Sequence, residues 1–240
     1  RYSRQIMLPK FDIAGQLSLK NASVLILGLG GLGSPAALYL GAAGVGKLVL
    51  ADDDQVDLSN LQRQVIHSQQ SLGQAKVESA AAQLSRINPH LHCECINERL
   101  EGAALKTIIS EVDLVLDCSD NFATRFQINK YCVETQTPLI SAAAIRMEGQ
   151  ITVYDARDPS SPCYQCLYSD GSEQEMTCSE SGVMSPLVGI LGSMQAMEAI
   201  KLLSGLGESL VGKLLMLDAM SMQWRSLKLK KDPKCSCCGQ

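Results

Sequence analysis

The sequence predicts an α/β fold built on a mostly parallel sheet with helices on both faces. Four short segments, 23–30, 47–54, 113–120 and 138–145, each contain a continuous apolar run, as strands covered on both sides usually do. Helical patterns lie between them, at about 34–43, 74–87 and 122–136. Strands that alternate with helices in this way form parallel sheets. A weaker candidate strand covers 93–97.

After residue 149 the pattern changes to antiparallel-type strands around one long helix. Strand-like runs occur at 150–155 and between 213 and 230. The helix between them has Ser185 as its expected N-cap, Pro186 in its first turn and Gly205 just past its end. Its Met and Leu stripe predicts core packing. We expect one domain over 1–240, with 151–240 as an extension of the sheet formed by 1–150.

Composition excludes several classes of partner. The net charge of -4 disfavours nucleic acid and anionic membranes, which attract basic surfaces. No uninterrupted apolar run reaches the ~18 residues of a membrane span, and the first residues lack the apolar centre of a signal peptide. We therefore expect a soluble, cytoplasmic protein with no membrane or nucleic-acid partner.

A glycine-rich turn follows the first predicted strand and precedes a helix. Gly28, Gly30, Gly31 and Gly33 allow a tight turn there and let backbone N–H groups approach a phosphate at the helix N-terminus. Asp52 ends the next strand, about twenty residues further on, where a ribose-binding acid belongs. The sheet is therefore predicted to be Rossmann-like and to bind a nucleotide. A nucleotide site of this kind would also fit an NAD-dependent dehydrogenase or a nucleotide-binding scaffold without catalytic activity, and both remain open as alternatives to an ATP-using enzyme.

The turn contains no lysine, so a triphosphate bound there would need positive charge from elsewhere. Arg63 and Lys76, in the segment after the second strand, are the obvious sources. Asp120 is the last residue of the segment 113–120, at the carboxyl end of the strand, where ligands bind in such sheets. Its carboxylate suits Mg²⁺ held against phosphate oxygens. The alternative role for Asp120 is to cap the helix that follows.

The ten cysteines include two CxxC pairs. Cys163 with Cys166, and Cys235 with Cys238, are predicted to form one tetrahedral zinc site, with Cys237 as a substitute for Cys238. Four thiolates leave no open position, so the metal would be structural. Small buried hydrophobes are the expectation for the remaining cysteines in apolar surroundings: Cys93, Cys95, Cys118 and Cys132.

Five stretches together resemble the MoeB/ThiF family, the bacterial relatives of ubiquitin-activating enzymes: "RYSRQI", "GLGGLGS", "LSNLQRQ", "DCSDN" and the distal cysteine pairs. The resemblance covers the whole chain. It implies a homodimeric enzyme that uses ATP, Mg²⁺ and Zn²⁺ and adenylates the C-terminal Gly-Gly carboxylate of a small ubiquitin-like sulfur carrier, releasing pyrophosphate. Residues 1–150 would bind the nucleotide, and 151–240 the carrier.

The resemblance also implies roles for individual residues. Asp52 would hold the ribose hydroxyls, Asp120 would bind Mg²⁺, and Arg4 would enter the partner subunit's site. Arg63 and Lys76 would act on the triphosphate. The full implied ATP set is Gly28, Gly30, Gly31, Gly33, Asp52, Ser59, Asn60, Leu61, Gln62, Arg63, Lys76, Asp120 and Asn121. No role follows for three further acids, which we expect to be solvated in the loop: Asp53, Asp54 and Asp57.

Two subgroups of the family compete. The stretches 143–154 and 218–220 resemble MoeB, which serves molybdopterin (molybdenum cofactor) biosynthesis, whereas 51–64 and 223–229 resemble ThiF, which serves the thiamine pathway. We favour the MoeB-like subgroup.

Cys178 is a candidate thiol in the polar segment 167–183, expected to be a mobile crossover loop. ThiF-like enzymes carry a cysteine there that receives the activated carrier, but acids flank Cys178 and no basic residue lies near it in the sequence. Nearby acids raise a thiol pKa. We expect Cys178 to be dispensable for adenylation.

Overall fold

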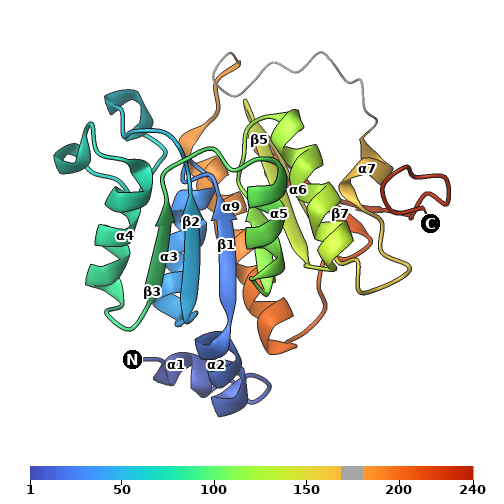
Figure 1. Cartoon of the computed structure of the whole chain (residues 1–240), viewed down its shortest axis with the longest axis horizontal. Helices are drawn as coiled ribbons and strands as arrows, with labels where there is room; N and C mark the ends of the chain where they lie inside the picture. The colour runs from blue at the N-terminus through green and yellow to red at the C-terminus, as the bar shows by residue number, and fades with distance from the viewer. Residues whose placement is uncertain (169–180, 240) are drawn as a thin grey trace.

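A computed structural model describes residues 1–168 and 181–239. The described residues form an eight-stranded sheet in the order β3-β2-β1-β4-β5-β6-β7-β8 (Figure 1). The pairs from β3 to β5 are parallel and those from β5 to β8 antiparallel. The strands are β1 (Ser23–Leu27), β2 (Lys47–Ala51), β3 (His92–Ile96), β4 (Leu114–Asp117), β5 (Leu139–Ile145), β6 (Glu148–Tyr154), β7 (Lys213–Asp218) and β8 (Gln223–Lys228). The predicted fold class, including its antiparallel extension, is confirmed.

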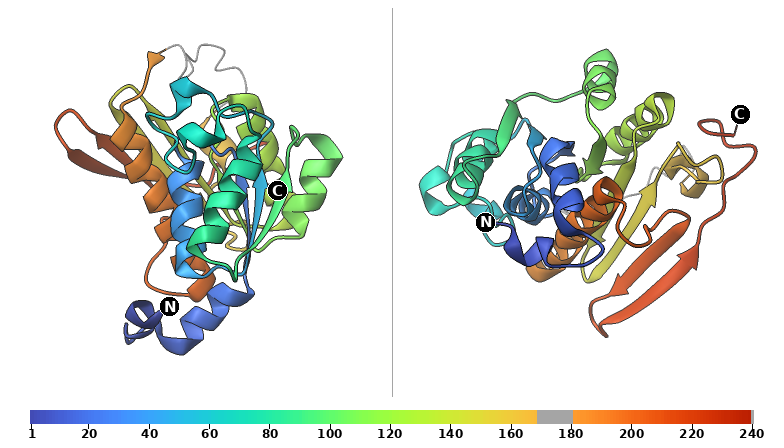
Figure 2. Two further views of the ribbon diagram at one scale, coloured as in Figure 1. Left: turned by 90° about the vertical axis from the view of Figure 1, so that its left-hand side faces the viewer. Right: turned by 90° about the horizontal axis from the view of Figure 1, so that it is seen from below.

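Helices cover both faces of the sheet, as Figures 1 and 2 show. The described helices are α1 (Ser3–Ile6), α2 (Asp12–Asn21), α3 (Gly33–Ala43), α4 (Lys76–Ile87), α5 (Gly102–Ser110), α6 (Phe122–Thr135), α7 (Tyr164–Leu167) and α9 (Ser185–Ser204). Strand β1 shows why the core has two layers. Val24 and Ile26 face the α2, α3, α4 and α9 side, Leu25 and Leu27 face α5 and α6, and all four are buried. A parallel strand buried on both faces needs such an uninterrupted apolar run.

Two positions in the first βα turn accept only glycine. Gly28 has a φ of 92°, and a Cβ there would lie 2.8 Å from the Cys118 carbonyl oxygen. A Cβ on Gly33 would lie 1.9 Å from the Gly28 carbonyl oxygen. The glycine pattern therefore closes a tight turn between β1 and α3, as the sequence predicted.

The long helix α9 begins one residue earlier than predicted. Ser185 is its first residue and Met184 its N-cap, so the Ser185 hydroxyl does not accept a helix N–H as a cap would and instead donates to the Gln62 carbonyl. Gly205 ends the helix in the left-handed conformation, as predicted. Among the described residues α9 is the one helix long and apolar enough to cross a membrane. It packs against α3 and the sheet, with Leu187 and Leu191 buried, as a core helix does.

Four of the described α-helices were not predicted from the sequence. The short α1 and the longer α2 occupy the N-terminal segment, α5 precedes β4, and the short α7 follows Cys163. Leu105 and Ile109, four residues apart on α5, are fully buried. Their helical spacing was therefore present in the sequence, but the segment of nine residues was too short to predict a helix. The weak candidate strand at 93–97 is confirmed as β3.

Candidate active site

The predicted nucleotide residues converge at the carboxyl edge of the parallel strands. The glycine turn follows β1, Asp52 follows β2 and Asp120 follows β4, and these three strands are neighbours in the sheet. The order β2-β1-β4 marks the point where successive connections leave in opposite directions, which is where open α/β sheets bind ligands. Phosphates, ribose and a cation would therefore meet within one crevice.

Asp52 holds the glycine turn through hydrogen bonds to the backbone. Its Oδ2 accepts the N–H of Leu29 at 2.6 Å, and its Oδ1 accepts the N–H of Asp54 at 2.9 Å. Burial raises the pKa of Asp52, and the nearby Lys76 ammonium opposes that rise. Each carboxylate oxygen has a second lone pair, so Asp52 can still accept a hydrogen bond from a ligand hydroxyl.

Lys76 opens α4 and is 5% exposed. Its Nζ lies 2.6 Å from Asp54 Oδ2 and 3.8 Å from Asp52 Oδ1. Asp54 is exposed, as expected of a solvated loop acid, and its carboxylate also compensates the buried Lys76 ammonium. Asp57 is also exposed, as expected, and its Oδ1 accepts the N–H and the hydroxyl of Ser59 at 2.8 and 2.6 Å and so caps the 3₁₀ turn Leu58–Asn60. Asp53 is exposed.

The polar loop after β2 is held by hydrogen bonds between its side chains and its backbone. Arg63 is half-buried, and its Nη1 donates to the Ser59 carbonyl at 3.1 Å. The Asn60 side chain accepts the N–H of Asp57 at 3.2 Å, and the Gln62 carbonyl accepts from Ser185 on α9. Leu61 is half-buried. The loop that carries the implied triphosphate residues is thereby fastened to α9.

Gln64 lies beside the glycine turn and was not predicted. It is 4% exposed, and its Oε1 has no hydrogen-bond partner among the described residues. Its Nε2 lies 3.6 Å from the position a Cβ on Gly30 would take. Buried amide groups are normally paired, so this one is suited to a ligand at the turn. Its place at the end of "LSNLQRQ" was the available signal.

Asp120 lies exposed on the turn between β4 and α6. The alternative that it caps α6 is wrong, because Asn121 is the N-cap and its Oδ1 accepts the N–H of Thr124 at 2.9 Å. The turn is held by hydrogen bonds to Asp117, the last residue of β4. Like Gln64, Asp117 was not predicted as a site residue. Asp117 is 1% exposed and accepts the Ser119 N–H and hydroxyl and the Ser141 hydroxyl, at 3.0, 2.6 and 2.9 Å. Its anchoring fixes the turn and leaves the Asp120 carboxylate facing solvent.

Arg4 does not join this group in its own chain. It is exposed on α1, and residues of α1 and just before it contact the C-terminal ends of α3 and α4. Gln5 Nε2 donates to the Ala43 carbonyl at 3.0 Å, and Asn88 Nδ2 donates to the Tyr2 hydroxyl at 2.8 Å. The glycine turn and Lys76 lie at the opposite ends of α3 and α4, which at about 1.5 Å per residue are each roughly 16–18 Å long. Figure 1 shows α1 below the strands, away from their carboxyl ends.

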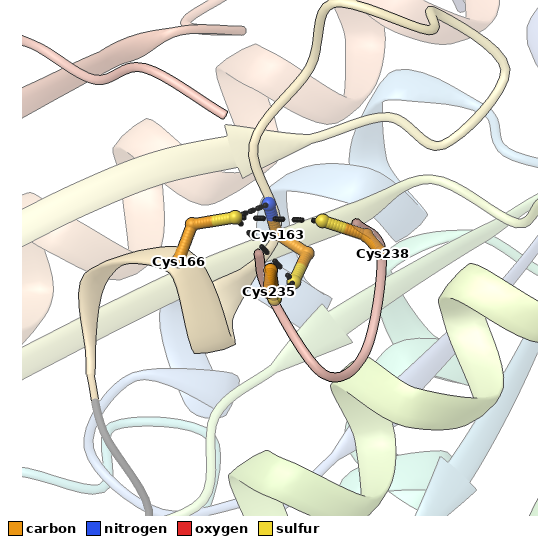
Figure 3. Close-up of side chains that lie close together, drawn as sticks. All are labelled: Cys163, Cys166, Cys235 and Cys238. Carbon is orange, nitrogen blue, oxygen red and sulfur yellow. Dashed lines mark hydrogen bonds between the residues drawn. The ribbon is translucent and has the colours of Figure 1, made fainter. Parts of the chain in front are cut away.

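The two CxxC pairs meet, as Figure 3 shows. The sulfur of Cys163 lies 3.7 Å from that of Cys235 and 4.0 Å from that of Cys166, and the sulfurs of Cys166 and Cys238 are 3.4 Å apart. The four sulfur atoms lie within 4.8 Å of one another. Tetrahedral thiolates about 2.3 Å from a zinc ion are about 3.8 Å apart, so the donor set fits that metal.

The other cysteines differ among themselves. Cys237 lies beside the four-sulfur group but outside it, and its sulfur accepts from Asn129 Nδ2 at 3.3 Å. Cys118 and Cys132 are buried, as predicted, and burial raises the pKa of both thiols. Cys93 is half-buried and packs against the core, whereas the prediction is wrong for Cys95, which is exposed because β3 is an edge strand. Cys178 lies outside the described residues.

A cavity of about 290 Å³ lies away from the glycine turn. It is lined by the end of α6 and the C-terminal cysteine segment, with Thr137, Lys231 and Cys237 among its walls. It contains none of the predicted nucleotide residues. The candidate active site is therefore the carboxyl edge of the parallel strands rather than this cavity.

Relatives of the chain carry names that bear on this site. Molybdopterin-synthase adenylyltransferase of Escherichia coli (strain K12) is 55% identical over 240 residues, covering 100% of this chain and 96% of that protein. The sulfur carrier protein ThiS adenylyltransferase of the same strain is 48% identical over 239 residues, covering 100% and 94%. The crystal structure of E. coli MccB with ATP superposes with a TM-score of 0.83 at 25% identity, covering 95% of this chain and 69% of that one.

The model of the ThiF family matches residues 2–237. The match spans the glycine turn, the polar loop, Asp120 and both CxxC pairs. The resemblance inferred from the sequence motifs is confirmed, and the higher identity to the molybdopterin relative agrees with the favoured subgroup. The chain belongs to the ThiF family.

Proposed function

We propose that the protein adenylates the C-terminal Gly-Gly carboxylate of a small ubiquitin-like sulfur carrier, most closely in the manner of the MoeB subgroup. The observation that supports the proposal is the position of the glycine turn, Asp52 and Asp120 at the carboxyl ends of three neighbouring strands, with Lys76 3.8 Å from Asp52. The names of the relatives supply the substrate class. A dehydrogenase would have no use for Arg63 and Lys76 beside its two phosphates.

The chemistry is a displacement at the α-phosphorus of ATP. The carrier carboxylate attacks that phosphorus, a mixed anhydride forms, and the bond to pyrophosphate breaks. Negative charge grows on the leaving pyrophosphate, so cations fixed beside it lower the barrier. Lys76 and Arg63 take this role, and the Gly30 and Gly31 amides hold the phosphates at the α3 N-terminus.

Mg²⁺ would be held by Asp120 and phosphate oxygens. The carboxylate is a hard oxygen ligand on a turn that Asp117 holds firmly, and magnesium favours one or two carboxylates plus phosphate and water. When bound, the ion neutralises charge on the phosphates and orients them for in-line attack.

Zinc would be bound by the four cysteines and would tie the C-terminal segment to α7. No further ligand position remains in a four-thiolate site, so its contribution is to stability. In this proposal the metal keeps the extension 151–240 folded.

The carrier would dock on that extension. Strand β8 is an edge strand whose six residues are all exposed, and the β7–β8 ribbon presents apolar side chains to solvent. They are Met216, Met220, Met222, Trp224 and Leu227. A homodimer would bring Arg4 of one subunit to the nucleotide site of the other, and the enzyme would act in the cytoplasm.

The test is carrier-dependent ATP–pyrophosphate exchange with the purified protein. Exchange should appear with the molybdopterin-pathway carrier and be weaker with the thiamine-pathway carrier, following the difference in identity of 55% against 48%. Preference for the thiamine carrier, with a reducible adduct that vanishes in Cys178→Ala, would move the assignment to the ThiF type. NAD binding without exchange with either carrier would reject the proposal.

A further inference from the structure

The peptide groups on both sides of Leu29 are held by side chains. Leu29 lies between Gly28 and Gly30, and its own side chain is fully buried. Its N–H donates to Asp52, while its carbonyl oxygen lies 3.1 Å from Nε2 of His67 and accepts a longer bond from Ser34 Oγ at 3.3 Å. Direct side-chain contacts therefore hold the middle of the glycine turn from two sides.

His67 is buried and paired at both ring nitrogens. It is 8% exposed, and its Nδ1 lies 2.9 Å from the hydroxyl of Ser79. A carbonyl oxygen only accepts, so Nε2 must carry the proton. In the neutral ring Nδ1 then accepts the Ser79 hydroxyl, which defines the tautomer. Burial lowers the pKa of His67 and favours this neutral form.

The orientation of the Leu29 carbonyl determines the orientation of the next amide. Leu29 C=O and Gly30 N–H belong to one planar trans peptide, so they point in opposite directions. With the carbonyl directed at His67, the Gly30 N–H points away from His67. Turning this carbonyl over would turn the Gly30 amide with it.

Both supports of Leu29 lead to the first residues of α4. Ser79 and Lys76 are three residues apart on that helix. Ser79 contacts Leu29 through His67, and Lys76 lies 3.8 Å from Asp52, which binds the Leu29 N–H. The glycine turn and the helix that carries Lys76 are thus joined by two separate chains of contacts.

We propose that His67 is a positioning residue of the nucleotide site, which holds the Leu29–Gly30 peptide so that the Gly30 amide can donate to a phosphate. This inference rests on the proposed function only in that the ligand is a nucleotide phosphate. His67 itself does not contact the ligand. Its loss should therefore weaken ground-state binding of ATP, through the turn, more than it slows the chemical step.

The test compares His67→Leu with His67→Gln, whose amide nitrogen restores a donor near the Nε2 position. ATP binding is measured by calorimetry without carrier, and KM for ATP and kcat by pyrophosphate exchange. The Leu variant should raise the ATP Kd and KM about fivefold, since the loss of one hydrogen bond of about 1 kcal/mol has that effect, with a smaller change in kcat. The Gln variant should recover most of the affinity. A folded Leu variant with wild-type ATP affinity would overturn the proposal, as would equal loss in both variants.

A second measurement does not depend on the variants folding. The chain has three histidines, so ¹⁵N spectra of labelled wild-type protein are simple to assign. His67 should give the signature of a neutral ring protonated at Nε2 and not at Nδ1. The opposite tautomer would contradict the contact with Leu29. Since ATP binding is measured without carrier, absence of pyrophosphate exchange would count against the proposed function and leave this inference standing.

Discussion

The Lys76 ammonium lies 2.6 Å from the Asp54 carboxylate and 3.8 Å from that of Asp52. A nucleotide bound against the glycine turn would bring phosphate charge to this group and compete with Asp54 for the ammonium. Removing Lys76 would also leave two carboxylates uncompensated and affect folding. Arg63 makes no ion pair with the described residues and is the cleaner cation to remove.

Arg63→Ala should lower the adenylation rate by about two to three orders of magnitude while changing ATP affinity far less, because the charge acts mainly on the leaving pyrophosphate. Exchange kinetics and ATP calorimetry separate the two effects. Arg86→Ala, an exposed cation at the far end of α4, is the matched control and should be active. Equal losses of rate and affinity in Arg63→Ala would show that Arg63 acts in ground-state binding.

Metal analysis should find one zinc ion per chain. Cys235→Ser should lose the metal and lower the melting temperature, because four-thiolate sites contribute directly to folding. Cys237→Ser should keep it, since Cys237 stands outside the four-sulfur group. Zinc loss in both variants, or zinc-free wild-type protein with reduced cysteines, would refute this ligand set.

Mixing inactive Arg4→Ala and Asp120→Ala proteins should restore partial exchange activity. In a hybrid dimer one site combines an intact Arg4 with an intact Asp120, and the distance of α1 from its own crevice favours action across subunits. Native mass spectrometry would verify that subunits exchange. If they exchange and activity stays absent, Arg4 does not act across the interface.

Stability should fall on acidification partly through His67. Burial lowers the pKa of its folded form, so below the unfolded value of about 6.5 the unfolded chain binds a proton that the folded chain resists. This contribution to stability is lost as the pH falls from about 6.5 toward the folded pKa. Denaturant unfolding at pH 7.5 and 5.5 should show a smaller pH effect in His67→Gln than in wild type or in the exposed-site control His90→Gln. Identical pH effects in all three would contradict this assignment.

Sequence patterns predicted the sheet because its central strands are buried on both faces, which leaves uninterrupted apolar runs such as 23–27. They also predicted the glycine turn and the cysteine pairs, whose chemistry depends on local spacing. Apart from the meeting of the two cysteine pairs, contacts between distant segments could not be predicted. The bonds of Asp117 to Ser141 and of His67 to Leu29 join residues 24 and 38 positions apart. The loop acids are exposed as expected, but the ion pair of Asp54 with Lys76, the first residue of α4, could not be predicted for the same reason.

The central claim is tested most directly by ATP–pyrophosphate exchange with two forms of the same carrier, one ending in Gly-Gly and one lacking the last glycine. If the carrier's terminal carboxylate is the nucleophile, the intact carrier should support exchange, and the shortened one should support about a hundredfold less, because its carboxylate no longer reaches the α-phosphorus. Equal exchange with both forms, or exchange without any carrier, would contradict the account.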